Sequence, residues 1–171
     1  MNERWVVFDL IGVLAEPSWR DIARDPSLSS WGEFKLGRKD EASFWDAEQR
    51  ALYRRLLAFR RDRLELVRNL KSRGYKVCVA TNFSRDWLDH LKQKSGVGSL
   101  FDAEVVSAEV HAAKPDREFW QALLAKVPKA SVFVDDREEN CVAAQQAGLR
   151  AIWAHPACPV DLEVEELLHG S

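Results

Sequence analysis

Several residues of this sequence have types and positions suited to chemistry on phosphoryl groups. They are Asp9, Thr81, Asn82, Lys114, Asp135 and Asp136, and all except Lys114 stand at the end of a short apolar run. A carboxylate can attack an electrophile, carboxylate oxygens can hold a divalent cation, and a lysine can neutralise anionic charge. If the fold gathers these side chains, the sequence predicts a metal-assisted site for phosphoryl transfer.

The apolar runs before these residues predict a buried parallel sheet. Five runs lack in/out alternation and are expected to be strands covered on both faces: Trp5–Phe8, Lys76–Ala80, Ala103–Val106, Ser131–Val134 and Ala151–Ala154. Helical spacing of apolar residues is found between them, in residues 63–72, 84–94, 116–126 and 138–147. We therefore predict a three-layer, doubly wound, Rossmann-like α/β fold, which binds ligands at the carboxyl ends of its strands.

The chain between the first two strands does not follow this alternation. Residues 15–62 show no convincing strand and are expected to form three or four helices, with Asp40 as a candidate N-cap. We predict a small helical insertion of residues 15–62 over the carboxyl edge of the sheet, with residues 1–14 and 63–171 as the core domain. Trp19, Trp31 and Trp45 of this insertion are expected either to form its own core or to line a pocket or a dimer contact.

Composition narrows the class of protein. The chain has 171 residues, 46% hydrophobic residues and a formal net charge of -2, which is ordinary for one globular domain with an insertion and gives no reason to expect nucleic-acid binding. No run of apolar residues approaches the roughly 20 that span a bilayer. Three widely spaced cysteines predict reduced thiols. We expect a cytoplasmic protein that acts on a small molecule, not on a membrane.

Four segments in chain order resemble the motifs of the haloacid dehalogenase-like (HAD) superfamily. The segment Val6–Leu14, with Asp9, resembles the first motif, and Val77–Asn82, ending in Thr81, resembles the second; Lys114-Pro115-Asp116 resembles the third, and Val132–Asp136 with Asn140 resembles the fourth. The order and spacing match over nearly the whole chain. The insertion resembles a small C1-type helical cap of that superfamily.

This resemblance implies a role for each matching residue. Asp9 would be the nucleophile that forms an aspartyl intermediate. Its carboxylate, the backbone carbonyl of Ile11 and Asp136 would hold Mg²⁺, and Asp135 would support that site or share the metal. Thr81 and the amide of Asn82 would bind the transferring phosphoryl oxygens, and Lys114 would neutralise their charge, which is how phosphoryl transfer is generally catalysed.

The sequence departs from the HAD pattern at Ile11. Typical HAD phosphatases have a second aspartate there, which protonates the leaving group and then activates water. Isoleucine cannot transfer a proton, and general acid–base catalysis contributes roughly 10²–10⁴ in rate. We expect either a substrate with a good leaving group, such as an acyl phosphate, or another proton donor, for which His111 and Glu16 are candidates.

Three activities are consistent with this departure. The first is Mg²⁺-dependent hydrolysis of a small phosphorylated metabolite, which the retained Asp135 and Asp136 favour. The second is carbon–halogen hydrolysis, because the haloacid dehalogenases also lack the second aspartate. The third is a low-activity or non-catalytic binding protein. Arg20 of the insertion is the candidate substrate contact, and a cap this short predicts either a bulky substrate or a homodimer in which a second subunit closes the cleft.

Overall fold

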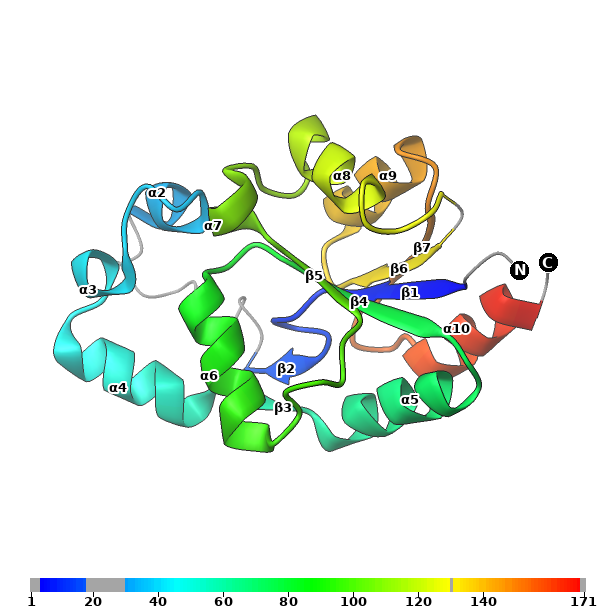
Figure 1. The fold of residues 1–171 in the computed structure, drawn as a ribbon, viewed down its shortest axis with the longest axis horizontal. Coiled ribbons are helices and arrows are strands. Elements are labelled where there is room, and N and C mark those ends of the chain that lie inside the picture. The colour runs from blue at the N-terminus through cyan, green and yellow to red at the C-terminus, as the bar shows by residue number, and fades with distance from the viewer. Residues whose placement is uncertain (1–3, 18–29, 130, 170–171) are drawn as a thin grey trace.

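The computed structural model describes residues 4–17, 30–129 and 131–169 and centres on a five-stranded parallel sheet (Figure 1). The strands are β1 (Trp5–Phe8), β4 (Lys76–Thr81), β5 (Ala103–Val106), β6 (Val132–Asp135) and β7 (Arg150–Trp153). Their order is β5-β4-β1-β6-β7, so the chain moves outward on one side of β1 and then on the other. This switch point at β1 is where an open α/β sheet binds its ligand.

Helices cover both faces of the sheet. They are α5 (Arg61–Ser72), α6 (Arg85–Ser95), α8 (Arg117–Leu124), α9 (Glu138–Gln146) and α10 (Val160–His169). Figure 1 shows α8 and α9 on one face of the sheet and α5 and α10 on the other. Each expected strand agrees with its observed counterpart to within one residue, and each of the four expected helices to within two. The three-layer α/β fold predicted from the sequence is confirmed.

Alternate residues of the central strand supply two hydrophobic cores. Val7 packs with Phe119 and Leu123 of α8, whereas its neighbours Val6 and Phe8 join the cluster on the opposite face. Every one of these five side chains is fully buried. A strand with apolar residues on both faces can only be satisfied in the middle of a covered sheet, so this packing fixes β1 at the centre.

The insertion contains α2 (Trp31–Lys35), α3 (Glu41–Phe44) and α4 (Ala47–Leu56), as expected for a helical segment. The expectation that it holds no strand was wrong. Strand β2 (Ala15–Glu16) pairs antiparallel with β3 (Ala58–Phe59), and the amide of Arg60 donates to the carbonyl of Leu14 (2.8 Å). Two-residue strands cannot show a sequence period, and this pairing joins segments more than forty residues apart. The domain boundaries at residues 14/15 and 62/63 stay a prediction.

Aromatic side chains form the centre of the insertion. Phe34 and Phe44 stack with ring centroids 4.4 Å apart, and Trp45 is buried against Phe44 at 4.7 Å. The carboxylate of Asp40 accepts a hydrogen bond from the Ser43 amide (2.7 Å), which confirms it as the N-cap of α3. Of the three tryptophans, Trp45 belongs to this core and Trp19 lies outside the described residues.

The described residues also include one short helix that the sequence did not predict, and cysteines that form no disulfide. Helix α7 (Ser107–Val110) follows β5 and was not expected. Cys78 and Cys141 are buried and, like Cys158, form no disulfide. Within residues 4–17, 30–129 and 131–169, the structure contains no helix with the length and apolar character of a membrane span.

Candidate active site

Three carboxylates meet at the carboxyl edge of the sheet. Asp9 follows β1 directly and its amide donates to the carbonyl of Val134 in β6 (2.8 Å), which ties the two strand ends together. Asp135 ends β6 and Asp136 follows it. One oxygen of each of these three carboxylates lies within 4.8 Å of the others. The parallel sheet thus brings together residues that are 126 or more positions apart.

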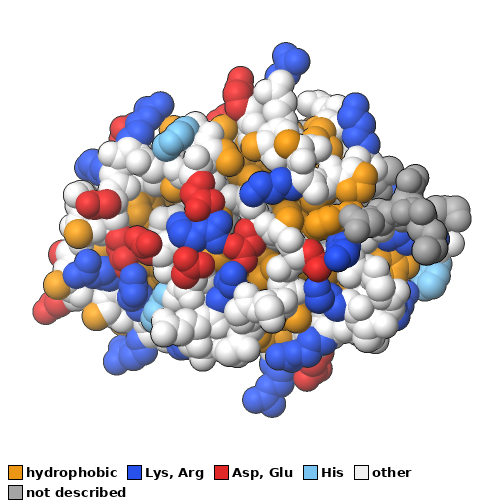
Figure 2. Space-filling model, viewed as in Figure 1, with side chains coloured by type: hydrophobic (Ala, Val, Ile, Leu, Met, Phe, Trp, Pro, Cys, Tyr) orange, Lys and Arg blue, Asp and Glu red, His pale blue; other side chains and the backbone are white. Residues whose placement is uncertain are grey.

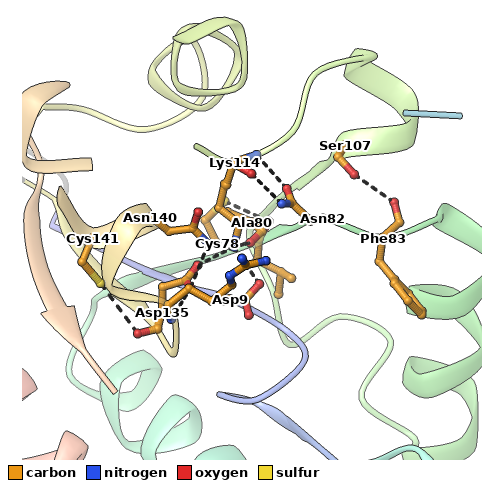
Figure 3. A network of polar contacts seen from close by, with 12 residues as sticks. Asp9, Cys78, Ala80, Asn82, Phe83, Ser107, Lys114, Asp135, Asn140 and Cys141 are labelled. Carbon is orange, nitrogen blue, oxygen red and sulfur yellow. Dashed lines mark hydrogen bonds and ion pairs between the residues drawn. The ribbon is translucent and has the colours of Figure 1, made fainter. Parts of the chain in front are cut away.

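Lys114 lies at the centre of this group (Figure 3). Its Nζ donates to Asp9 Oδ1 (2.7 Å), to Asp135 Oδ2 (2.6 Å) and to the backbone carbonyl of Ala80 (2.7 Å). Lys114 is 2% exposed, Asp9 7% and Asp135 0%. Buried charges are stable only when paired and hydrogen-bonded, and all three donor positions of this ammonium are used.

Asn82 holds the backbone of Lys114 in place. Its Oδ1 accepts from the Lys114 amide and its Nδ2 donates to the Lys114 carbonyl, both at 2.8 Å, as the facing dashed lines in Figure 3 show. The Asn82 side chain therefore positions the lysine through both of its polar atoms. Thr81, the last residue of β4, is 1% exposed and lines the same cavity as Asp9.

The carboxylate of Asp135 is engaged by protein donors at both oxygens. Oδ2 accepts from Lys114, and Oδ1 accepts from the Arg137 amide (2.9 Å) and from Asn140 Nδ2 (3.0 Å). Asn140 is itself 3% exposed. Asp135 therefore orients the lysine and the loop after β6, and Asn140 contacts this carboxylate directly.

The electrostatics of the group favour a cation. Burial, opposed by Lys114 and assisted by the neighbouring Asp135 and Asp136, raises the pKa of Asp9 to about 7. Burial disfavours the charged form of Lys114 too, but Asp135 and Asp9 outweigh it and raise the pKa of the ammonium. Among the described residues, the three carboxylates outnumber the buried ammonium, and a divalent cation would neutralise this excess of negative charge.

Gly12 allows the Asp136 carboxylate to lie close to the backbone of the loop after β1. Gly12 has φ +99°, and a Cβ there would lie 2.6 Å from Asp136 Oδ2 and 2.7 Å from its Cγ. Only glycine adopts this backbone conformation freely, and only glycine leaves room for the carboxylate. The oxygen-rich donor set and this close approach both fit a hard divalent ion such as Mg²⁺.

A cavity opens in front of this polar group. It is lined by Asp9, Ile11, Trp31, Thr81, Asn82, Phe83, Lys114, Asp136, Arg137 and Asn140. The structure brings Asp9, Ile11, Thr81, Asn82, Lys114 and Asp136 to one cavity, and Asp135 contacts Lys114 beside it. Arg20 lies outside the described residues, so its proposed contact with substrate stays a prediction.

Neither alternative proton donor lines this cavity. His111, with φ 53°, has its Nδ1 3.0 Å from the carbonyl of Leu36, and Glu16 is exposed in the β2–β3 pair. Among the described lining residues the carboxylates are Asp9 and Asp136, and no histidine is present. The sequence reasoning missed Phe83 and Arg137 as lining residues, although each directly follows a predicted site residue in the chain.

A family model for haloacid dehalogenase-like hydrolases matches residues 15–148. The chain belongs to this family. The HAD resemblance predicted from the four motifs is thereby confirmed, and the protein is a hydrolase of that family. The matched range begins after Asp9, so the placement of Asp9 rests on the geometry at the end of β1.

Known HAD proteins resemble the chain in sequence and in structure. The sesquiterpene phosphatase AstK of Aspergillus oryzae is 25% identical over 95% of each chain. The pyrophosphatase PpaX of Bacillus cereus is 34% identical, over 50% of this chain and 41% of its own length. The structure of a HAD family enzyme variant of Bacteroides thetaiotaomicron, in complex with magnesium and inorganic phosphate, superposes with a TM-score of 0.76 at 19% identity, covering 92% of this chain and 96% of that one.

Proposed function

We propose that this HAD hydrolase is a Mg²⁺-dependent phosphohydrolase that acts through an aspartyl intermediate at Asp9. The observation that carries the proposal is the contact of the buried Lys114 ammonium with Asp9, in a cavity that Thr81 and Asp136 also line. A nucleophile, a hydroxyl and a cation facing one space is the arrangement that phosphoryl transfer needs. The phosphatase names of two relatives and the magnesium and phosphate complex of a structural neighbour support it.

Asp9, Asp136 and the backbone carbonyl of Ile11 would hold Mg²⁺. Asp135 is less suited to share the ion because both of its oxygens already accept hydrogen bonds from protein groups. Bound Mg²⁺ would offset the negative charge of the transferring phosphoryl group and keep Asp9 ionised. The Thr81 hydroxyl and the backbone amide of Asn82 would hydrogen-bond the phosphoryl oxygens, while Lys114 holds Asp9 in position for attack.

The leaving group must depart without a proton from the side chain at position 11. Isoleucine is inert as an acid, and His111 and Glu16 do not line the cavity. Departure of a weakly basic group does not need a proton. The substrates we propose are therefore small acyl phosphates or other phosphorylated molecules whose leaving group is stable as an anion.

Phosphate release from acetyl phosphate and from ethyl phosphate, with Mg²⁺ present, tests this function. We expect turnover of acetyl phosphate and a rate on ethyl phosphate that is lower by roughly 10² or more, since Ile11 cannot protonate the alkoxide. Asp9→Asn should abolish turnover of acetyl phosphate. The matched control is Asp89→Asn, which changes an exposed aspartate of α6 and should keep the wild-type rate.

Each other outcome has a defined meaning. Equal rates on the two substrates would show that a group other than Ile11 supplies the proton. Absence of phosphate release from either substrate, at enzyme concentrations sufficient to detect single turnovers, would reject the phosphohydrolase. Chloride release from a 2-chloro acid would then identify a dehalogenase, and its absence would favour a binding protein.

A further inference from the structure

The cavity in front of Asp9 has one polar wall and one apolar wall. The polar wall consists of the polar lining residues Asp9, Thr81, Asn82, Lys114, Asp136, Arg137 and Asn140. The apolar wall consists of Ile11, Trp31 and Phe83, which we call the apolar subsite. Ile11 is 7% exposed and Phe83 2%, whereas Trp31 is half-buried.

The apolar subsite is backed by the core of the insertion. The Trp31 ring lies 5.6 Å from the Phe83 ring, 5.7 Å from Phe34 and 5.9 Å from Phe44, each centroid to centroid. Tilted aromatic pairs at such distances are favourable and restrict the rings that form them. The wall is therefore preorganised and does not need to rearrange around a ligand.

Contacts between the insertion and the core hold this wall over the nucleophile. Ser107 Oγ donates to the carbonyl of Lys35 at the end of α2 (2.5 Å), and it is also 3.3 Å from the carbonyl of Phe83. Figure 3 shows the second of these bonds beside the polar network. Gly37, with φ +71°, lets the insertion approach the Ala108 carbonyl, which a Cβ would meet at 2.3 Å.

The chemistry of the two walls selects what can bind between them. A phosphoryl group belongs at the polar wall, beside the lysine and the hydroxyl. The rest of the substrate then faces Ile11, Trp31 and Phe83, whose aliphatic and aromatic surfaces would leave a sugar hydroxyl or a second charge without the hydrogen bonds that water gave it. An apolar group would instead gain from leaving water at this surface.

We propose that the apolar subsite binds the leaving group, and that the substrates are phosphorylated molecules whose leaving group is an apolar organic anion such as an aromatic carboxylate. This inference rests on the proposed phosphohydrolase function and adds the substrate class. With benzoyl phosphate, Asp9 attacks phosphorus, the bond between phosphorus and the acyl oxygen breaks, and benzoate leaves with the bonding electrons. Water then cleaves the aspartyl phosphate, restoring the Asp9 carboxylate and releasing H₂PO₄⁻.

The test compares benzoyl phosphate with acetyl phosphate by kcat/KM. Both release carboxylates of similar basicity, so the comparison changes the apolar surface and holds the leaving-group chemistry nearly constant. We expect benzoyl phosphate to be favoured at least about tenfold, from burial of the phenyl ring. In Trp31→Ala this preference should fall below about threefold, and in Trp31→Phe it should largely return, because the ring contact is restored.

The matched control is Leu52→Ala. Leu52 is an exposed apolar residue of α4 in the same insertion and does not line the cavity, so its variant should keep the wild-type preference. Equal kcat/KM on the two substrates in the wild-type protein would overturn the inference. An unchanged preference in a folded Trp31→Ala protein would overturn it as well.

A second measurement needs no variant and no turnover. Phenylphosphonate and methylphosphonate cannot be hydrolysed, and calorimetry in the presence of Mg²⁺ gives the dissociation constant of each. We expect phenylphosphonate to bind at least about tenfold more tightly, since it differs by the ring alone. Equal affinities would reject the apolar subsite. If the protein hydrolyses neither acyl phosphate, the phosphohydrolase function is rejected, and the two affinities still test the apolar subsite on their own.

Discussion

Ile11 shows that one residue can change the demands on a substrate without disturbing the rest of the site. The position keeps its backbone carbonyl, which is the group expected to face the cation, and loses only a side-chain acid. Its side chain joins the hydrophobic cluster that includes Trp31 and Phe83. The same residue therefore removes proton transfer and extends the apolar wall, and both changes favour an apolar leaving group that is stable as an anion.

Gly12 gives a residue-scale prediction about the cation. In Gly12→Ala the new Cβ would displace the Asp136 carboxylate, which it would meet at 2.6 Å, so we expect the dissociation constant for Mg²⁺ to rise at least about tenfold. Isothermal titration calorimetry measures this constant directly. The substitution also places alanine at φ +99°, a backbone cost of about 1–3 kcal/mol that would lower stability by itself.

Gly74→Ala separates these two effects. Gly74 has a similar φ of +84°, and no atom lies within 4 Å of its Cβ position. We expect it to lose comparable stability in urea unfolding and to bind Mg²⁺ as the wild type does. Equal Mg²⁺ affinity in the two variants would argue against Asp136 as a ligand.

The sequence indicated which residues meet at the edge of the sheet better than it indicated what their side chains contact. Asp9, Thr81 and Asp135 could be placed because each ends an apolar run, and parallel strands bring such ends to one edge. The role of the Asn82 side chain could not be predicted, because it bonds to the backbone of Lys114, which is 32 residues away in the sequence. Which oxygens of Asp135 are free for a metal is likewise a matter of tertiary hydrogen bonding, which no residue pattern records.

At the scale of elements, the segment before α8 is attached to the end of β4 through Asn82. Its two hydrogen bonds to the Lys114 backbone, each 2.8 Å long, fix the residue whose ammonium contacts Asp9. We predict that Asn82→Ala lowers the free energy of unfolding by about 1–3 kcal/mol, because buried backbone groups lose their partner. Urea unfolding measures the loss of stability, and kcat/KM for acetyl phosphate measures the effect of losing the lysine's position.

Two comparisons sharpen this prediction. Asn82→Asp keeps the oxygen that accepts from the Lys114 amide and loses the donor, so both losses should be smaller than in Asn82→Ala. Asn69→Ala is the matched control, because Asn69 is exposed on α5 and its side chain accepts from Arg73 four residues on. Wild-type stability and activity in Asn82→Ala would contradict the positioning role.

Elements differed in how well the sequence predicted them. Long periodic segments such as α5 and α6 were placed to within two residues, since apolar spacing specifies the face that packs. The β2–β3 pair was missed because two residues carry no period and its partner strands are far apart in sequence. Helix α10 was also missed, although Val160, Val164 and Leu168 recur every four residues and are buried. That signal was available.

At the scale of the whole molecule, the charge distribution separates the surface from the site. The face in Figure 2 carries acidic and basic side chains interspersed, in keeping with the net charge of -2. Inside, by contrast, three carboxylates face a single ammonium at the switch point of the sheet. The molecule therefore concentrates its unbalanced charge where a cation and a phosphoryl group would enter, and the fold that does so was readable from the alternation of strands and helices.

The central claim is that Asp9 becomes phosphorylated, and acid-quenched trapping tests it most directly. Wild-type protein would be mixed with ³²P-labelled acetyl phosphate, with Mg²⁺ or with EDTA, quenched in acid within one turnover, digested and analysed by mass spectrometry. We predict a phosphoryl adduct on the peptide that contains Asp9, dependent on Mg²⁺ and absent in Asp9→Asn. Phosphate release without any label on that peptide, or an equal label in Asp9→Asn, would contradict the account.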